Sequence, residues 1–167
     1  MAFWTELQPI APYHADEVQV LLSDPAVLAW TSIPEPYPQD GAKNWIEEVR
    51  SLREEGKEEH FAIINEKKKL VGVTGLQEIE EERAELGYWI GKPYWNQGYA
   101  SKANQELVRR AFQDLDLKEL YARPLEQNAS SQRVLEKLGF EPHGLEDHET
   151  PKCRSKGKVI RYVLKRP

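Results

Sequence analysis

The sequence has little of what several protein classes require. Its single cysteine, Cys153, can form neither an internal disulfide nor a cysteine-based metal cluster. The four histidines show no metal-ligand spacing, so we expect no metal. No stretch approaches the roughly 20 apolar residues of a membrane span, and the first residues lack the basic segment and apolar run of a signal peptide. We therefore expect a cytoplasmic protein without a membrane partner.

Basic residues are also in the minority. The chain has 23 Lys and Arg against 28 Asp and Glu, which gives a net charge of −5. Binding to phosphate backbones needs a basic surface, so nucleic acid is not expected as a partner. Acidic pairs such as Glu54 and Glu55 fit a solvated surface, or alternatively steer a basic acceptor toward a site.

The organisation of the chain predicts one domain over residues 1–167. We find no internal repeat and no low-complexity linker, and a length of 167 residues is common for one domain. The hydrophobic fraction of 40% is too high for a disordered chain. We expect a monomer or a homodimer.

The apolar pattern predicts both strands and helices. An edge strand is expected at Leu7–Ile10, a helix at Ala15–Leu22, and a second helix after Asp40, whose side chain can cap it. Three strands joined by short polar turns then predict an antiparallel meander, followed by helix, strand, helix and closing strand. These elements cover residues 61–64, 70–76, 84–90, 100–115, 119–123, 130–138 and 159–164. The expected fold class is α/β, as an α+β mixed sheet with helices on its faces.

The segment from Glu85 to Ser101 carries the strongest sign of a site. A strand ends at Ile90, a loop turns at Gly98, and a helix begins. Helix starts carry free N–H groups and a partial positive charge, which suits a phosphate or pyrophosphate. Lys102 opposes the helix dipole, so it is either balanced by a bound anion or a tolerated surface lysine. The glycine spacing fits neither the dinucleotide motif nor the P-loop.

Gly87 interrupts the apolar strand that precedes this loop. A glycine in a strand marks a bulge or a close approach of another backbone, and a bulge would splay the strand from its neighbour. Alternatively, Gly87 makes room for packing under an aromatic side chain.

Three motifs together resemble the GNAT superfamily of N-acetyltransferases, and more narrowly its ribosomal-protein N-terminal acetyltransferase-like branch, the RimJ/RimL type. The matching pieces are Glu85-Leu86-Gly87-Tyr88-Trp89-Ile90, Tyr94-Trp95-Asn96-Gln97-Gly98-Tyr99-Ala100-Ser101, and Asn128-Ala129-Ser130-Ser131 through Leu138-Gly139-Phe140. Weaker similarity extends from about Leu7 to Leu164. Three departures from the superfamily pattern stand at Trp95, Lys102 and Leu135.

The resemblance implies a GNAT-like acyl-CoA N-acyltransferase fold, a mostly antiparallel splayed sheet with helices on both faces. It implies acetyl-CoA as co-substrate, with the pantetheine arm near Trp89 and Ile90 and the pyrophosphate on the backbone of Gln97, Gly98, Tyr99, Ala100 and Ser101. Asn128 resembles an asparagine that contacts the cofactor. The superfamily often places a tyrosine near the sulfur, but Leu135 stands there, and Ser131 resembles the branch's substitute.

The implied reaction transfers an acetyl group directly to a primary amine, which we expect to be a protein or peptide N-terminal α-amine. Glu85 is the candidate base, and Ser131 the candidate for hydrogen-bonding the sulfur; Glu85 is alternatively an exposed strand residue and Ser131 a helix cap. Trp30, Pro36 and Tyr37 are expected to line the acceptor side, or to pack the first helices. Neither His60 nor His148 is expected to be a base. A small-molecule amine acceptor (a polyamine, amino acid or antibiotic) and a non-catalytic acyl-CoA-binding module are the alternatives.

Overall fold

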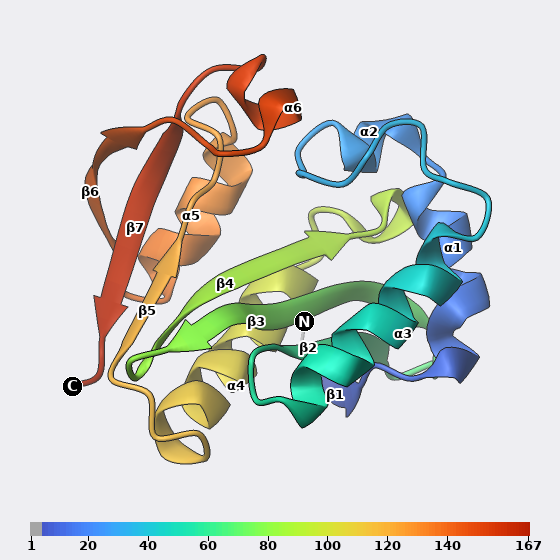
Figure 1. The fold of residues 1–167 in the computed structure, drawn as a ribbon, viewed down its shortest axis with the longest axis horizontal. Coiled ribbons are helices and arrows are strands. Elements are labelled where there is room, and N and C mark those ends of the chain that lie inside the picture. Colours follow the sequence, from blue (N-terminus) through green and yellow to red (C-terminus); the bar gives the residue numbers. More distant parts are fainter. Residues whose placement is uncertain (1–4) are drawn as a thin grey trace.

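The computed structural model describes residues 5–167, which form one seven-stranded sheet in the order β1-β2-β3-β4-β5-β7-β6 (Figure 1). The strands are β1 Thr5–Pro9, β2 Glu59–Asn65, β3 Leu70–Glu80, β4 Arg83–Ile90, β5 Glu119–Ala122, β6 Glu141–Glu146 and β7 Val159–Lys165. The helices are α1 Ala15–Leu22, α2 Pro25–Leu28, α3 Gly41–Glu54, α4 Tyr99–Gln113, α5 Ala129–Lys137 and α6 Pro151–Arg154, with 3-10 turns at Pro12–His14 and Lys92–Tyr94.

The sheet is mixed and mostly antiparallel, as predicted. Only β4 and β5 pair in parallel, and their pairing covers three positions, from Arg83 opposite Glu119 to Glu85 opposite Tyr121. The other neighbouring strands pair antiparallel. Beyond Glu85, β4 and β5 diverge, so the sheet opens between its two halves (Figure 1). The splayed sheet that the resemblance implied is therefore present.

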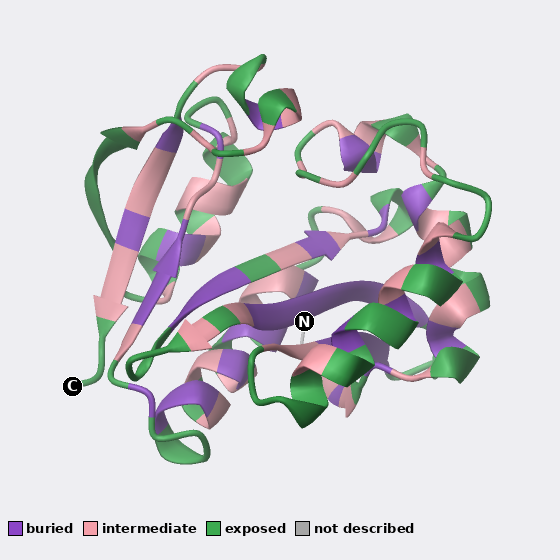
Figure 2. Cartoon of the chain, viewed as in Figure 1, coloured by how far each residue is buried: buried purple, intermediate pink, exposed green. Residues whose placement is uncertain are grey.

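Each face of the sheet carries its own hydrophobic core (Figure 2). On one face α1 and α3 cover β2, β3 and β4 with a cluster that includes Val18, Ile46, Val73 and Trp89. On the other face α4 and α5 pack through Leu107 and Leu135 among others. Side chains of β4 alternate between the two cores, with Ala84 and Leu86 in one and Trp89 in the other, because successive side chains of a strand point to opposite faces. Helices on both faces follow from this alternation.

Several local predictions are confirmed and two are wrong. Helix α1 has the predicted bounds, and Gly139 follows α5 with a φ of 96°, which ends the helix as expected. Asp40 occupies the position before α3, but its side chain makes no capping hydrogen bond. Gly87 pairs regularly with Gly75, so there is no bulge at Gly87; the irregularity of this hairpin lies near its turn, between Gln77 and Glu80.

Two shorter findings concern residues 5–167 only. None of the helices in this part of the chain is long and apolar enough to cross a membrane. No group of three or more His, Cys, Asp or Glu side chains within it is arranged to hold a metal ion.

Candidate active site

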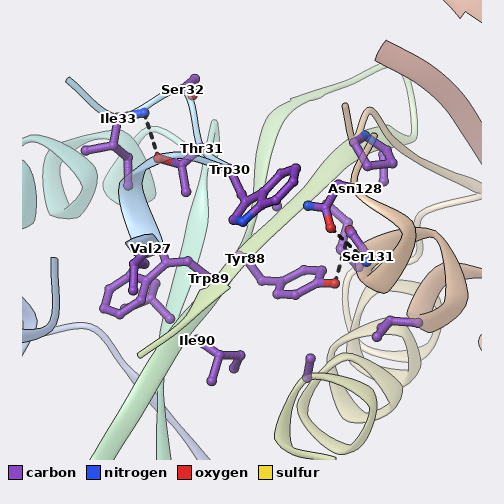
Figure 3. Close-up of a pocket in the computed structure, with 18 of the residues that line it drawn as sticks. Val27, Trp30, Thr31, Ser32, Ile33, Tyr88, Trp89, Ile90, Asn128 and Ser131 are labelled. Atoms are coloured by element: carbon purple, nitrogen blue, oxygen red, sulfur yellow. Dashed lines mark hydrogen bonds between the residues drawn. The ribbon is translucent and has the colours of Figure 1, made fainter. Parts of the chain in front are cut away.

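The opening between β4 and β5 forms the mouth of a cleft of about 1340 Å³ (Figure 3). Its walls come from the end of β4, the segment after β5, the starts of α4 and α5, and the loop between α2 and α3. Small-molecule sites usually enclose about 300–1,000 Å³. The cleft is therefore large enough for a long ligand together with a second molecule.

The backbone of β4 offers hydrogen-bonding groups at this opening. In an antiparallel pair the residues alternate between those bonded to the partner strand and those facing away. Gly91 N–H donates to the Val71 carbonyl (2.8 Å), and Trp89 has the same phase and faces β3. The N–H groups of Tyr88 and Ile90 therefore point to the opening. The Ile90 carbonyl accepts from the Trp95 indole (2.7 Å).

The direction of these backbone groups differs between the two residues predicted at the end of β4. The pantetheine arm was predicted to lie near Trp89 and Ile90, and the N–H of Ile90 points to the opening. Trp89 instead directs its backbone to β3 and its largely buried ring into the core under α1 and α3, although the ring also borders the cleft. Tyr88, which was not predicted, supplies the second backbone N–H.

The start of α4 is bare, as an anion site requires. Gly98 precedes the helix with a φ of 86°, a left-handed conformation that favours glycine, and it has no side chain to cap the first N–H groups. Gly98, Tyr99, Ala100 and Ser101 all border the cleft. A smaller hollow of about 280 Å³ adjoins it and is lined by Gly98, Ser101, Lys102, Gln105, Lys137 and Leu138. Two lysines beside an uncapped helix start favour a phosphate there.

Gln97 does not reach the cleft with the residues that follow it. Its side chain is exposed and donates to the Pro93 carbonyl (3.1 Å). Asn96, which has a φ of 61°, lines the cleft in its place. The phosphate contact predicted for Gln97 was through its backbone, and it stays a prediction.

Ser131 lies opposite Tyr88 across the opening (Figure 3). The Tyr88 hydroxyl donates to Ser131 Oγ (3.1 Å), which leaves the proton of Ser131 free to be donated elsewhere. The capping role considered for Ser131 belongs to Asn128, whose Oδ1 accepts from the Ser131 N–H (3.2 Å). Burial raises the pKa of the Tyr88 phenol, so this hydroxyl stays protonated at neutral pH.

Glu85 is neither exposed nor free. Its side chain is 7% exposed, and both carboxylate oxygens accept from Arg123, at 2.8 and 3.1 Å. Gln77 donates to it as well, at 3.1 Å. To accept a proton from a substrate, Glu85 would have to give up part of this arrangement. Its geometry suits the positioning of Arg123 better than the base role expected from the sequence.

Arg123 connects the two halves of the sheet with the segment before α6. Besides Glu85 on β4 it binds Glu149 through two hydrogen bonds, at 2.8 and 2.9 Å. Glu149 and Glu85 raise the pKa of Arg123, and Arg123 lowers the pKa of Glu149 to about 2. Arg123 therefore fixes one wall of the opening.

Two of the three residues expected on the acceptor side line the cleft. Trp30 and Tyr37 line the cleft, whereas Pro36 is exposed and does not. Trp30 is 46% exposed, and in Figure 3 its ring extends in the direction of Asn128. Tyr37 packs over Gly41 and against the core beneath α3, and burial raises its pKa to about 12. Tyr37 therefore both lines the cleft and packs against the first helices.

The loop that carries this wall is held from the far side of the cleft. Lys152 of α6 donates to the carbonyls of Leu28 (2.8 Å) and Ile33 and pairs with Glu35 (3.0 Å). Lys156 donates to the Ala29 carbonyl (2.6 Å) and pairs with Glu35 as well. Figure 1 shows α6 and α2 facing each other above the end of β4. Lys152 and Lys156 therefore bridge the two sides of the cleft.

These features match the acyl-CoA N-acyltransferase fold that the motifs implied. The family model described as an acetyltransferase (GNAT) domain matches residues 5–141. The uncharacterized N-acetyltransferase p20 of Bacillus licheniformis is 31% identical over 170 residues, which covers 98% of this chain and 96% of that protein. The chain belongs to the GNAT family of acetyl-CoA-dependent N-acetyltransferases.

Two solved structures share the fold at lower identity. The ribosomal alpha-N-protein acetyltransferase RimL, in complex with coenzyme A, superposes with a TM-score of 0.84 at 19% identity, over 96% of this chain and 93% of that one. The spermidine N-acetyltransferase of Vibrio cholerae, in complex with CoA and spermine, gives a TM-score of 0.82 at 18% identity, over 96% and 95%. The predicted resemblance to the RimJ/RimL type is confirmed.

Proposed function

We propose that this N-acetyltransferase acetylates the α-amino group of a peptide or protein N-terminus. The charge of the cleft carries this proposal. Among its lining residues in the described chain, the only carboxylates are Glu48 and Glu85, and Glu85 is already paired with Arg123. Arg123, Arg133 and Lys137 line the same cleft. Such a cleft suits an acceptor with one amine better than a polyamine with several charges.

The residues present fit acetyl-CoA as the acetyl donor, which supplies the acetyl group as a reactive thioester. The bare start of α4 at Gly98, with Ser101, Lys102 and Lys137 nearby, would hold phosphates. The N–H groups of Tyr88 and Ile90 are available to the amide-bearing arm of the molecule. Asn128 organises the start of α5 and so holds Ser131 toward the opening.

Two side chains would act near the reacting atoms. The Ser131 hydroxyl, which accepts from Tyr88, can donate its own proton to the departing sulfur. Glu85 would orient Arg123 at the wall of the opening, and it is the base only if the ion pair separates when substrate binds. Backbone N–H groups at the end of β4 can stabilise negative charge on the carbonyl oxygen.

The acceptor proposal predicts a specific order of substrates. A short peptide with a free N-terminal serine or alanine should be acetylated with a kcat/KM about 10–100-fold higher than spermidine, because a polar group left without a partner in the cleft costs about 1–3 kcal/mol, and a charged group costs more. Thiol release gives the rate, and fragmentation mass spectrometry gives the modified nitrogen. The matched control is the same peptide with a blocked α-amine and an internal lysine.

Three results would change the assignment. Faster acetylation of spermidine than of the free peptide would make the enzyme a polyamine acetyltransferase. Equal rates for the free and the blocked peptide would place the acetyl group on lysine. Turnover of neither amine class, with acetyl-CoA bound, would remove the acceptor proposal and leave the family assignment in place.

A further inference from the structure

We propose that His60, held by Glu58, is the proton acceptor for the incoming amine, and that Gly75 and Gly87 form a side-chain-free floor between His60 and the opening of the sheet. The proposal rests on amine acetylation as the reaction, but not on which amine is the acceptor. It gives the base role to a residue of β2, two strands away from the opening, and it assigns Glu85 to the positioning of Arg123.

The sheet register brings these residues into one row. His60 of β2 lies opposite Gly75 of β3, and Gly75 lies opposite Gly87 of β4. Residues directly opposite each other in antiparallel strands have their side chains on the same face. This is the face that α1 and α3 cover, where the acceptor wall lies. His60, Gly75 and Gly87 all border the cleft.

The imidazole of His60 leaves no room for a side chain at Gly75. A Cβ at this position would lie 2.3 Å from Nδ1 of His60, closer than any real contact. The ring therefore extends over Gly75, in the direction of β4. Two strand spacings, about 10 Å, separate the backbones of His60 and Gly87. The imidazole covers part of this distance, and the amine or one water can cover the rest.

Gly87 is not explained by the fold. Its φ is not among the positive values, and a Cβ there would meet nothing closer than the Gln77 amide at 3.9 Å. Alanine would fit without strain, so neither packing nor backbone conformation requires glycine at this position. The proposed side-chain-free surface between His60 and the opening does require glycine at this position, because a side chain would block the approach of the amine.

Glu58 completes the arrangement. Its Oε1 lies 2.6 Å from Nε2 of His60, and the edge-on ring of Trp45 packs against the imidazole at a centroid distance of 5.2 Å. A carboxylate that accepts from Nε2–H fixes the neutral tautomer in which Nδ1 carries the lone pair. The carboxylate also stabilises the imidazolium that forms when Nδ1 takes a proton. The side chain of His60 is 11% exposed, so its orientation is constrained.

The proposed acetylation conserves protons. The ammonium form of the acceptor gives one proton to Nδ1, and His60 later passes it to water. The neutral nitrogen then forms the C–N bond as the C–S bond breaks, and its second proton ends on the released thiol, by way of the Ser131 hydroxyl in the proposed scheme. One proton leaves to solvent and one ends on sulfur, which matches the conversion of an ammonium and a thioester to an amide, a thiol and a proton.

The test compares His60→Ala with His143→Ala, whose histidine is exposed on β6 away from the cleft. We expect His60→Ala to lower kcat/KM by about 100-fold for the preferred amine, within the range of general-base catalysis. Calorimetry should show unchanged acetyl-CoA affinity. Added imidazole should restore part of the activity of His60→Ala but not alter the wild type. Glu58→Gln should lose about 10-fold, mainly in kcat, because it affects His60 indirectly.

A second acceptor separates base catalysis from a structural role. A peptide with an aminooxyacetyl N-terminus has a nitrogen that is neutral at pH 7, so it should lose little activity in His60→Ala. Equal losses with both acceptors, or wild-type rates in His60→Ala, would overturn the proposal. Turnover of no amine by the wild type would instead overturn the reaction on which it rests.

Discussion

Replacement of Gly98 with aspartate should lower the affinity for acetyl-CoA by more than about 100-fold. The carboxylate would lie at the bare start of α4, where the cleft and the lysine-lined hollow meet. Two unit charges about 4 Å apart repel by about 4 kcal/mol at an effective dielectric constant of about 20. About 1.4 kcal/mol corresponds to a factor of ten, so a single phosphate charge at that distance already gives the expected loss.

Gly98→Asn is the matched control for charge. Asparagine has nearly the shape of aspartate and tolerates the left-handed conformation at least as well, so the two variants share any backbone strain at a φ of 86°. Calorimetric titration with acetyl-CoA should show a much weaker Kd for aspartate than for asparagine. Equal affinities of the two variants would mean that the phosphates lie elsewhere.

Replacement of Arg123 with methionine should lower the free energy of unfolding by about 3–5 kcal/mol, the usual cost of leaving one partner of a buried ion pair alone. Glu85 would keep its charge with 7% of its side chain exposed and with Gln77 as its remaining donor. Glu149 would tolerate the change, because 62% of its side chain is exposed. Denaturant unfolding followed by tryptophan fluorescence measures the difference.

Two further variants separate burial from charge in this experiment. The double variant Glu85→Gln with Arg123→Met should recover most of the lost stability, because no charge is then buried without a partner. Lys118→Met breaks the exposed pair with Glu82 and should cost less than about 1 kcal/mol. If Lys118→Met lowered the free energy of unfolding as much as Arg123→Met, burial of the Glu85–Arg123 pair would not increase its effect on stability.

The parts of the site that lie on one stretch of chain could be predicted from the sequence. The order of strand, glycine loop and helix start places Ile90, Gly98 and Ser101 together through local geometry alone, and each of them lines the cleft. The same holds for Asn128 and Ser131, which are three residues apart at the start of one helix. The helices and strands that carry these residues could be predicted because their apolar positions repeat within a few residues.

The parts that depend on strand register could not be predicted. Arg123 and Glu85 are 38 residues apart and meet because β5 pairs with β4 at its first residues only. The row from His60 to Gly87 likewise depends on the registers of two hairpins. A shift of one residue in either register would move the side chains to the opposite face. No local pattern in the sequence contains this information, so neither the Glu85–Arg123 pair nor the place of His60 beside the cleft could be predicted.

The lysine bridge between the two sides of the cleft has the same origin. Lys152 lies 124 residues from Leu28, and α6 is only four residues long, with no amphipathic repeat to mark it. The prolines around Glu35 favour extended backbone over a helix, but they do not indicate which residues hold this loop.

The most direct test of the central claim is hydrogen exchange at the opened edge of β4. If acetyl-CoA binds between β4 and β5, adding coenzyme A should slow exchange at the amides of Tyr88 and Ile90 and at residues 98–101, and leave the exposed edge of β6 unchanged. Slowed exchange at these amides would place the cofactor in the opened sheet, as the bare helix start and the free N–H groups predict. Tight binding of coenzyme A without any change at Tyr88 and Ile90 would contradict the account.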